Sequence, residues 1–440
     1  MAATPAVTPA VTPFVRTTML TPEPPPARET GAIKWLRENL FSSPLNAGLT
    51  LVALAVIWWI VSHIGPWFLH SVWDADSLAE CRQVLEERYG PGVNGACFAV
   101  IVERWPQLLF GFYPPELYWR PVLTLLLFFV AAAPILFQNL PRQMLWFTML
   151  FPALAYWLLW GGSLWMPLMA LAGLALILPA FRFGSRVNSI VGLIAAIAVP
   201  LVWWFFIAAP LGRALAAVVP LEMTYVPSNR FGGFMLSLII GISGIVLSLP
   251  LGILLALGRR SDLFLVKTVC VGFIEFIRGV PLITLLFTAS LLLNYFLPPG
   301  TNFDIILRVI IMVTLFSAAY MAEVVRGGLA ALPRGQYEAA DALGLDYWKA
   351  QRLIIMPQAL KISIPGIVNT FIGLFKDTTL VVFIGLLDPI GLSNAIRADT
   401  SWNGVYWELF IFIGLCFFVF CFGMSRYSMY LERRLKTDHR

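Results

Sequence analysis

The sequence predicts an all-α protein that crosses a membrane about ten times, and three observations support this fold class. Hydrophobic residues make up 59% of the 440-residue chain and charged residues only 12%, whereas soluble proteins carry roughly 45–50% and about 25%. The apolar residues lie in continuous runs that are long enough to cross a ~30 Å hydrocarbon layer as helices. Because these runs do not alternate with polar residues, the sequence excludes a membrane β-barrel.

The same composition excludes several other classes of protein. A chain with 16 Trp, 33 Phe and a mean hydropathy of +0.81 is not a cytosolic enzyme, a disulfide-rich secreted module or a DNA-binding domain. Its 30 basic and 24 acidic residues give a net charge of +6. In a membrane protein this excess bears on orientation in the bilayer, so no nucleic-acid partner is expected.

Residues 1–46 are predicted to form a disordered cytoplasmic tail. They contain the repeat TPAVTPAVTP and, at residues 21–26, the Pro-rich string TPEPPP. Such a segment buries too little apolar surface to fold. It is not a signal peptide, because no apolar core closely follows a charged start.

Ten apolar segments follow this tail and are the predicted membrane spans. They lie near residues 47–69, 120–138, 144–161, 164–182, 188–209, 232–257, 272–297, 304–325, 361–388 and 404–425. Basic residues orient them, because loops rich in Lys and Arg stay in the cytoplasm. With the N-terminal tail inside, most basic loops and the C-terminus are also cytoplasmic, and a loop near residues 70–119 is external.

Two cysteines in this external loop, Cys81 and Cys97, are a candidate disulfide. An oxidising compartment permits the bond, and in a loop of this size it contributes about 3 kcal/mol of stability. Neither cysteine has a CxxC partner or a clustered histidine, so no zinc site is predicted. The alternative, two unpaired thiols, stays open.

The character of the apolar runs changes near Arg230. Earlier runs are bulky, rich in Trp and nearly free of charge, whereas later runs contain charges and small residues. We therefore interpret residues 47–229 as an accessory membrane region and residues 230–440 as the working unit.

A polar segment, residues 330–360, separates two apolar runs of this unit and has the pattern of two short helices. Helix-forming residues 336–343 precede Gly344, where a left-handed residue ends a helix. Asp346 is then the expected N-cap of a second helix, 347–356, which stops before Pro357. The pattern predicts a rigid protrusion on the cytoplasmic face, although an ordinary amphipathic connector would also fit it.

Small side chains on the first of these helices, at Ala339, Ala340 and Ala342, would let a partner approach it closely. Glu338 beside them is the expected polar anchor for that partner.

Charged residues inside the apolar runs are a second candidate site, because ionisable groups in a membrane are costly and face each other or a pathway. Two pairs with i,i+3 spacing, near the cytoplasmic ends of their spans, are predicted to be structural ion pairs: Glu275 with Arg278, and Glu323 with Arg326. Lys376 and Asp377 lie deeper, beside Thr378. We interpret these three as part of a translocation pathway or its gate; for the two charged residues, the alternative is an internal ion pair.

Motifs for catalysis are absent from the sequence. It has no GxxxxGK[ST] phosphate loop, no HExxH and no GxSxG, and His63, His70 and His439 have no metal-ligand spacing. The chain is therefore predicted not to hydrolyse ATP and to bind no cofactor or metal.

Three ordered strings resemble ABC-importer permeases of the polar amino-acid, histidine/glutamine-type family. In chain order they are FIRGVPLITLLF at residues 276–287, the set Glu338-Ala339-Ala340 with Gly344 and Ile355-Met356-Pro357, and KDTTL at residues 376–380. The second of them carries the strongest signature. The string that begins at Glu338 is similar to the EAA signature, in which Leu is common at the position of Met356. The strings NGACFAVI and LYWRP further resemble the long permeases of general L-amino-acid or glutamate/glutamine/aspartate/asparagine systems.

The resemblance implies a five-helix type I ABC-importer permease core in the C-terminal half, within the bacterial inner membrane. It further implies that Glu338, Ala339, Ala340 and Gly344 belong to a coupling helix that docks on a cytosolic ATPase dimer, which binds the ATP and Mg. The other expected partners are a second, related permease in preference to a homodimer, a periplasmic solute-binding protein and an amino-acid substrate. The alternative function is an ion- or proton-coupled secondary amino-acid transporter.

Overall fold

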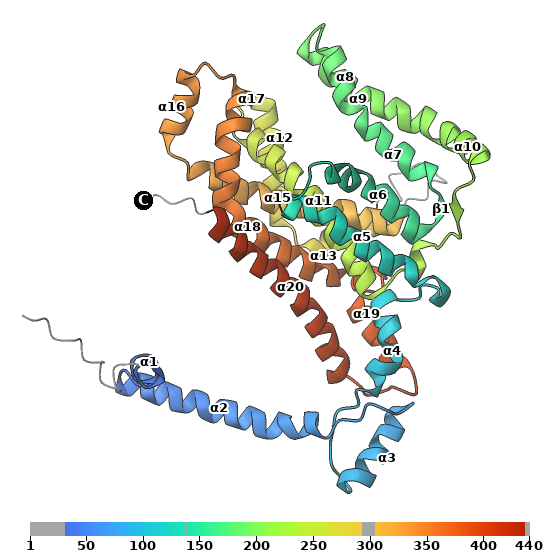
Figure 1. Ribbon diagram of the computed structural model, residues 1–440, viewed down its shortest axis with the longest axis vertical. Coiled ribbons are helices and arrows are strands. Elements are labelled where there is room, and N and C mark those ends of the chain that lie inside the picture. The colour runs from blue at the N-terminus through green and yellow to red at the C-terminus, as the bar shows by residue number, and fades with distance from the viewer. Residues whose placement is uncertain (1–30, 138, 293–303, 436–440) are drawn as a thin grey trace, which may run out of the picture. The chain divides into compact units, whose positions relative to one another are not determined.

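A computed structural model describes residues 31–137, 139–292 and 304–435 (Figure 1). The α-helices and strands are α1 (Gly31–Asn39), α2 (Pro44–Leu69), α3 (Leu78–Tyr89), α4 (Ala99–Phe110), α5 (Trp119–Leu136), α6 (Met144–Trp160), β1 (Gly162–Ser163), α7 (Trp165–Ala175), α8 (Ile177–Gly184), α9 (Ser189–Val202), α10 (Ala208–Val218), β2 (Glu222–Met223), α11 (Gly233–Arg259), α12 (Phe264–Gly279), α13 (Leu282–Phe287), α15 (Ile305–Ala330), α16 (Arg334–Ala342), α17 (Tyr347–Ala350), α18 (Met356–Asp377), α19 (Pro389–Ala398) and α20 (Trp407–Leu435). This confirms the predicted all-α polytopic fold.

Two compact units divide the chain. The first comprises residues 1–71 and 92–96, and the second comprises residues 72–91 and 97–440. The predicted division near residue 230 stays a prediction, because helices from both sides of it belong to the second unit.

Within the first unit, α2 is a lone apolar helix. Ser43 caps its N-terminus by accepting a hydrogen bond from the N–H of Asn46, and none of its side chains is buried. A helix that is apolar all round and unburied within its own unit suits a lipid environment.

The prediction of a disordered tail through residue 46 is wrong for its last part. Residues 31–39 form helix α1, with an ion pair of 3.7 Å between Lys34 and Glu38 one turn apart. The Pro-rich strings that suggested disorder lie in residues 1–30, outside the described part of the chain.

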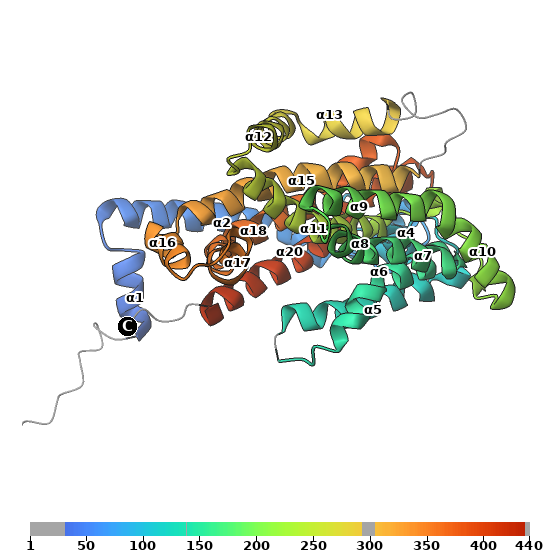
Figure 2. The same ribbon diagram turned by 90° about the horizontal axis from the view of Figure 1, so that it is seen from above.

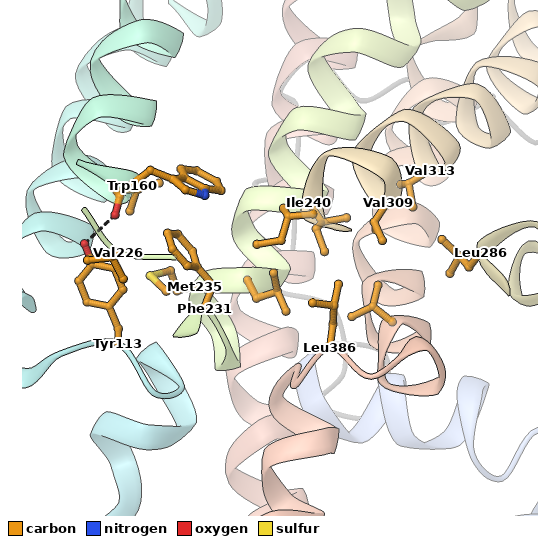
Figure 3. Packing of buried hydrophobic residues seen from close by; sticks show 14 of the residues in the cluster. Tyr113, Trp160, Val226, Phe231, Met235, Ile240, Leu286, Val309, Val313 and Leu386 are labelled. Carbon is orange, nitrogen blue, oxygen red and sulfur yellow. Dashed lines mark hydrogen bonds between the residues drawn. The ribbon is translucent and has the colours of Figure 1, made fainter. Parts of the chain in front are cut away.

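Helices α11, α15, α18 and α20 form the core of the second unit. In Figure 2, α13 runs alongside α15, and α12, which has a different direction, also contacts α15. Helix α6 and the residues at the end of α4 join this core through a large buried cluster around Trp160, Phe231 and Met235 (Figure 3). Two buried polar groups at this junction are paired: the Tyr113 hydroxyl donates to the Leu159 carbonyl at 2.7 Å, and the Trp160 indole N–H donates to the Ser228 hydroxyl at 2.8 Å.

Opposite ends of α11 define the two ends of this unit. At its start, the Gly233 N–H donates to the Leu387 carbonyl next to α4; just past its end, Arg260 contacts Tyr337 of α16. We call residues 72–91 and 97–113, with α3 and α4, the cap, and residues 334–350, with α16 and α17, the knob.

The span count follows the sequence prediction. Among the described residues, eight helices are long and apolar enough to cross a membrane, or nine if one sharply bent pair counts as one span. The shorter apolar helix α6 accounts for the remaining predicted segment.

The bent pair differs from the single span predicted near residues 272–297. Helix α12 ends at Gly279, and α13 begins after Pro281 with its axis turned by 104°. Pro281 lacks the N–H that would continue the helix, and it holds Val280 in an extended conformation. Residues 293–297 of the predicted span lie outside the described residues.

Candidate functional site

The knob is a helix, a glycine turn and a capped second helix. Gly344 has φ +67°, in the left-handed region that glycine adopts at low cost. Its N–H donates to the Asp341 carbonyl at 2.9 Å, and the Leu345 N–H donates to the Ala340 carbonyl at 3.2 Å. These two bonds form a Schellman motif, which satisfies carbonyls at the end of α16 and fixes the turn.

Asp346 caps the next helix. Its carboxylate accepts from the Lys349 N–H at 2.9 Å and pairs with the Lys349 amine at 2.8 Å. These hydrogen bonds hold the pKa of the Asp346 carboxyl below its ordinary value. The knob therefore has a defined conformation at both ends of its turn.

The second helix of the knob does not stop before Pro357, contrary to the sequence prediction. Helix α17 continues through a π-helical turn, residues 351–355, into α18, and Pro357 lies in the first turn of α18. A proline is tolerated there because the wider π-turn changes the hydrogen-bond register before the missing N–H. The knob is thus joined directly to a membrane-spanning helix.

The four residues predicted to contact a partner differ in solvent exposure. Glu338, Ala339 and Gly344 are exposed, whereas Ala340 is only 1% exposed and packs inside this chain. The geometry therefore removes Ala340 from the set of residues that a partner could touch. The sequence argument missed two exposed apolar residues of the knob, Leu343 and Trp348, at 72% and 67% exposed.

The charges near the knob form one network around Glu323 of α15. Its carboxylate accepts hydrogen bonds from Arg259 at 2.7 Å and from Arg326 at 3.0 Å, and it pairs with Arg278 at 3.8 Å. The network thus joins α11, α12 and α15 near the ends of these helices that lie beside the knob.

The predicted pairing of Glu275 with Arg278 is wrong. Glu275 accepts from Arg259 of α11 at 2.9 Å, while Arg278 reaches Glu323 of the neighbouring helix. The i,i+3 argument considered one helix at a time, whereas these long side chains pair across helices. Arg259 was missed, although its position two residues past the end of a predicted span suggested it.

Lys376, Asp377 and Thr378 lie where α18 changes into a 3-10 turn, residues 378–384. Lys376 is exposed, Asp377 is partly buried and Thr378 is fully buried, with its hydroxyl donating to the Phe375 carbonyl at 2.7 Å. Within the described part of the chain, neither charged side chain has an ion pair or hydrogen bond. The internal ion pair considered as an alternative is therefore not formed in this structure.

The cap contains the bond predicted between Cys81 and Cys97, which joins α3 to the residues before α4. The Cys97 N–H donates at 2.9 Å to the carboxylate of Glu408 in α20, which is 6% exposed. Arg104 of α4 pairs with Asp399 at 2.8 Å. Glu408 was missed, although an acidic residue in the last apolar run was a detectable signal.

Asp388 is a second carboxylate that the sequence argument missed. It is fully buried at the start of α19, where it accepts from the N–H groups of Gly391 and Ile390 at 2.9 and 3.2 Å. Burial raises the pKa of this carboxyl to about 6, and the two N–H donors oppose the rise.

Metal-binding sites are usually built from clusters of His, Cys, Asp and Glu side chains. Over residues 31–137, 139–292 and 304–435, no group of three or more His, Cys, Asp or Glu side chains could hold a metal ion. The features that characterise the site are therefore the helical membrane bundle and the rigid, exposed knob at one end of it.

Comparison with known proteins identifies the family. Residues 248–437 match the family described as binding-protein-dependent transport system inner membrane component. The glutamate/glutamine/aspartate/asparagine transport system permease protein BztC of Rhodobacter capsulatus is 62% identical over 433 residues, 97% of this chain and 99% of that protein. The inner membrane amino-acid ABC transporter permease protein YhdY of Escherichia coli is 39% identical over 94% of this chain and 96% of that protein.

A crystal structure of an amino acid ABC transporter with histidines aligns with 45% of this chain and 90% of its own, at 32% identity and a TM-score of 0.41. The two nearly full-length relatives decide the assignment. The chain belongs to the amino-acid permeases of the binding-protein-dependent ABC transporters, and it is a membrane-spanning translocating subunit.

Proposed function

We propose that this chain forms part of the translocation pathway of an ATP-driven importer for glutamate, glutamine, aspartate and asparagine in a bacterial inner membrane. The observation that carries the proposal is the 62% identity to a permease of that named specificity, which extends over nearly the whole of both chains. A broader range of L-amino acids is the competing specificity.

The knob is the proposed docking element for a cytosolic ATPase dimer, which binds ATP and Mg. Glu338, Ala339 and Gly344 offer a small-faced surface, and Leu343 and Trp348 supply exposed apolar anchors beside it. Large apolar side chains that become buried dominate the energy of many interfaces. The Schellman turn keeps these groups in a fixed arrangement, so less ordering is needed when they bind.

This assignment sets the orientation. The knob and both chain termini lie in the cytoplasm, and the cap lies in the periplasm, where its disulfide is chemically permitted. A periplasmic binding protein delivers the amino acid from that side, and a second, related permease completes the pathway.

Lys376, Asp377 and Thr378 are the proposed pathway or gate residues of this subunit. Among the described residues the two charged side chains form no ion pair and no side-chain hydrogen bond, and they lie at an irregular turn of a spanning helix. Ionisable groups in such positions commonly face a polar pathway, and an amino-acid zwitterion offers both charges to them.

The test is purification of the tagged chain in mild detergent, followed by transport in proteoliposomes with the binding protein outside and ATP inside. The proposal expects an ATPase subunit and a second permease to co-purify. It also expects ATP-dependent uptake of labelled glutamate that glutamine, aspartate and asparagine suppress and leucine does not. Suppression by leucine would assign the broader range. A chain that purifies alone, with uptake that an uncoupler abolishes, would overturn the ATP-driven mechanism.

A further inference from the structure

A tyrosine in the first helix of the knob connects three helices. The Tyr337 hydroxyl accepts a hydrogen bond from Nη1 of Arg260 at 3.0 Å and donates to the Leu329 carbonyl at 3.3 Å. Arg260 immediately follows α11, and Leu329 lies in the last turn of α15. One hydroxyl therefore ties α16 to the ends of two membrane-spanning helices.

The Arg260 guanidinium is held a second time by the same residue. Its central carbon lies 5.5 Å from the centroid of the Tyr337 ring, within the range of a cation–π interaction. The ring itself packs, partly buried, against an apolar cluster that includes Ala256 of α11, Met321 of α15 and Ala359 of α18. Contacts of this kind restrict the ring and the guanidinium to one arrangement.

A glutamine pair ties α16 to α18. The Gln358 side-chain amide donates to the Gln336 side-chain oxygen at 3.0 Å and to the Ile354 carbonyl at 2.9 Å. Helix α18 is also continuous with the second helix of the knob, and α15 precedes its first helix by three residues. Motion of the knob therefore reaches α15 and α18 through the backbone, whereas α11 is distant in the sequence.

We propose that Arg260 and Tyr337 are positioning residues that transmit the motion of the docked knob to α11. The proposal rests on the proposed function, because it requires an ATPase to move α16. The pair acts as a strut: the knob pushes or pulls the end of α11 through the hydroxyl and ring of Tyr337. Without it, α11 follows the knob only indirectly, through α15: the two helices pack together, Arg259 pairs with Glu323, and Arg260 has a long contact of 3.5 Å with the Leu329 carbonyl.

The test uses Tyr337→Phe, Arg260→Gln and the double variant in the complete transporter, reconstituted in proteoliposomes with its binding protein. Phe keeps the ring and removes both hydroxyl bonds. The measured quantity is amino-acid uptake per ATP hydrolysed, together with the amount of ATPase subunit that co-purifies. We expect intact complexes and a roughly tenfold lower uptake per ATP in either single variant, the scale of one lost hydrogen bond to a charged group. The loss in the double variant should fall well short of the product of the two single losses, because both variants remove the hydrogen bond between Arg260 and Tyr337.

A matched control is Tyr430→Phe. The Tyr430 hydroxyl accepts from Arg434 at 3.0 Å, but both residues belong to α20, so the bond connects no two helices. This variant should retain the uptake per ATP of the unaltered transporter. It removes the same chemical contact without removing a connection to the knob.

Two results would overturn the strut. One is an unchanged uptake per ATP in Tyr337→Phe and Arg260→Gln. The other is loss of the ATPase subunit from these variants, which would make Tyr337 a docking residue. Failure of the proposed function is seen separately, as an unaltered transporter without a bound ATPase or without ATP-driven uptake.

Discussion

The two ends of the second unit are built from different kinds of contact. At the cap end, a disulfide fixes α3, and the buried carboxylate of Glu408 accepts a hydrogen bond from a backbone N–H. The backbone of Gly111 also forms a β-bridge with Phe231, and that of Gly232 forms one with Leu387. A Cβ on Gly111 would lie 2.5 Å from Cα of Gly232, so the two backbone segments are in direct contact. Close-packed backbone and disulfide contacts of this kind leave little room for rearrangement.

At the knob end, side chains make the connections. Glu323 shares three arginines, and Arg260 and Tyr337 meet through hydrogen-bonding groups on separate helices. Ion pairs with partly exposed partners are individually weak and rearrange at little cost. From this difference we predict that the cap end is a fixed frame and that the knob end is the part that moves during transport.

Gly344→Pro should have the largest effect, because it breaks the moving end at its turn. Proline fixes φ near −65°, against +67° in this structure, and it removes the N–H that bonds to the Asp341 carbonyl. We expect normal insertion into the membrane and a loss of uptake of about 100-fold or more, since loss of alignment removes the driving force. Gly344→Ala, which keeps the N–H, should lose far less. Normal uptake by Gly344→Pro would contradict the coupling role.

Replacing Cys81 and Cys97 together by serine tests the fixed frame. The bond closes a loop with a sequence separation of 16, so its loss should cost about 3 kcal/mol of stability in the cap. We expect a lower Tm in detergent and almost unchanged uptake per ATP in the protein that remains folded. Cys416→Ser, at an unpaired cysteine, is the control for the chemical change. A coupling defect equal to that of Gly344→Pro would show that the cap moves too.

Local sequence signals predicted the parts of both regions that depend on neighbouring residues. Gly344 ends α16 and Asp346 caps α17 because their own backbone and side-chain chemistry favours these positions. Runs of apolar residues likewise predicted the spanning helices, since the bilayer thickness sets their length.

Contacts between distant segments could not be predicted in this way. Cys97 and Glu408 are 311 positions apart, and Arg260 and Tyr337 are 77 apart, so helix periodicity gives no information on either pair. The burial of Ala340 depends in the same way on how α16 lies against the other helices. The pathway role of Lys376 and Asp377 stays a prediction.

Asp388→Asn tests the buried carboxylate at the cap end. Because its pKa rises from 3.8 to about 6 on folding, the folded protein keeps a proton between these pH values that the unfolded chain has released. The contribution of this group to the free energy of unfolding is therefore at its maximum, at most about 3 kcal/mol, below about pH 4. This contribution is lost as the pH rises through about 6.

Asparagine at position 388 has no charge to bury, and its one oxygen can still accept from the Gly391 N–H. The weaker bond from the Ile390 N–H, which goes to the other carboxylate oxygen at 3.2 Å, is lost. We expect the variant to have a flatter dependence of Tm on pH between 4 and 7, and a higher Tm at pH 7. A pH profile identical to that of the unaltered protein would show that Asp388 does not titrate in this range.

Arg278→Gln should have the smallest effect, because the knob-end network is redundant. Glu323 would keep Arg259 at 2.7 Å and Arg326 at 3.0 Å, whereas the lost partner lies at 3.8 Å and is partly exposed. We expect a stability loss of about 0.5 kcal/mol or less, measured as Tm in detergent, and a difference that disappears in high salt. Glu323→Gln is the informative counterpart, since it leaves three arginines without their shared carboxylate. If Arg278→Gln destabilises the protein as much as Glu323→Gln does, the contacts at the knob end are not exchangeable, and the contrast between a fixed frame and a moving end fails.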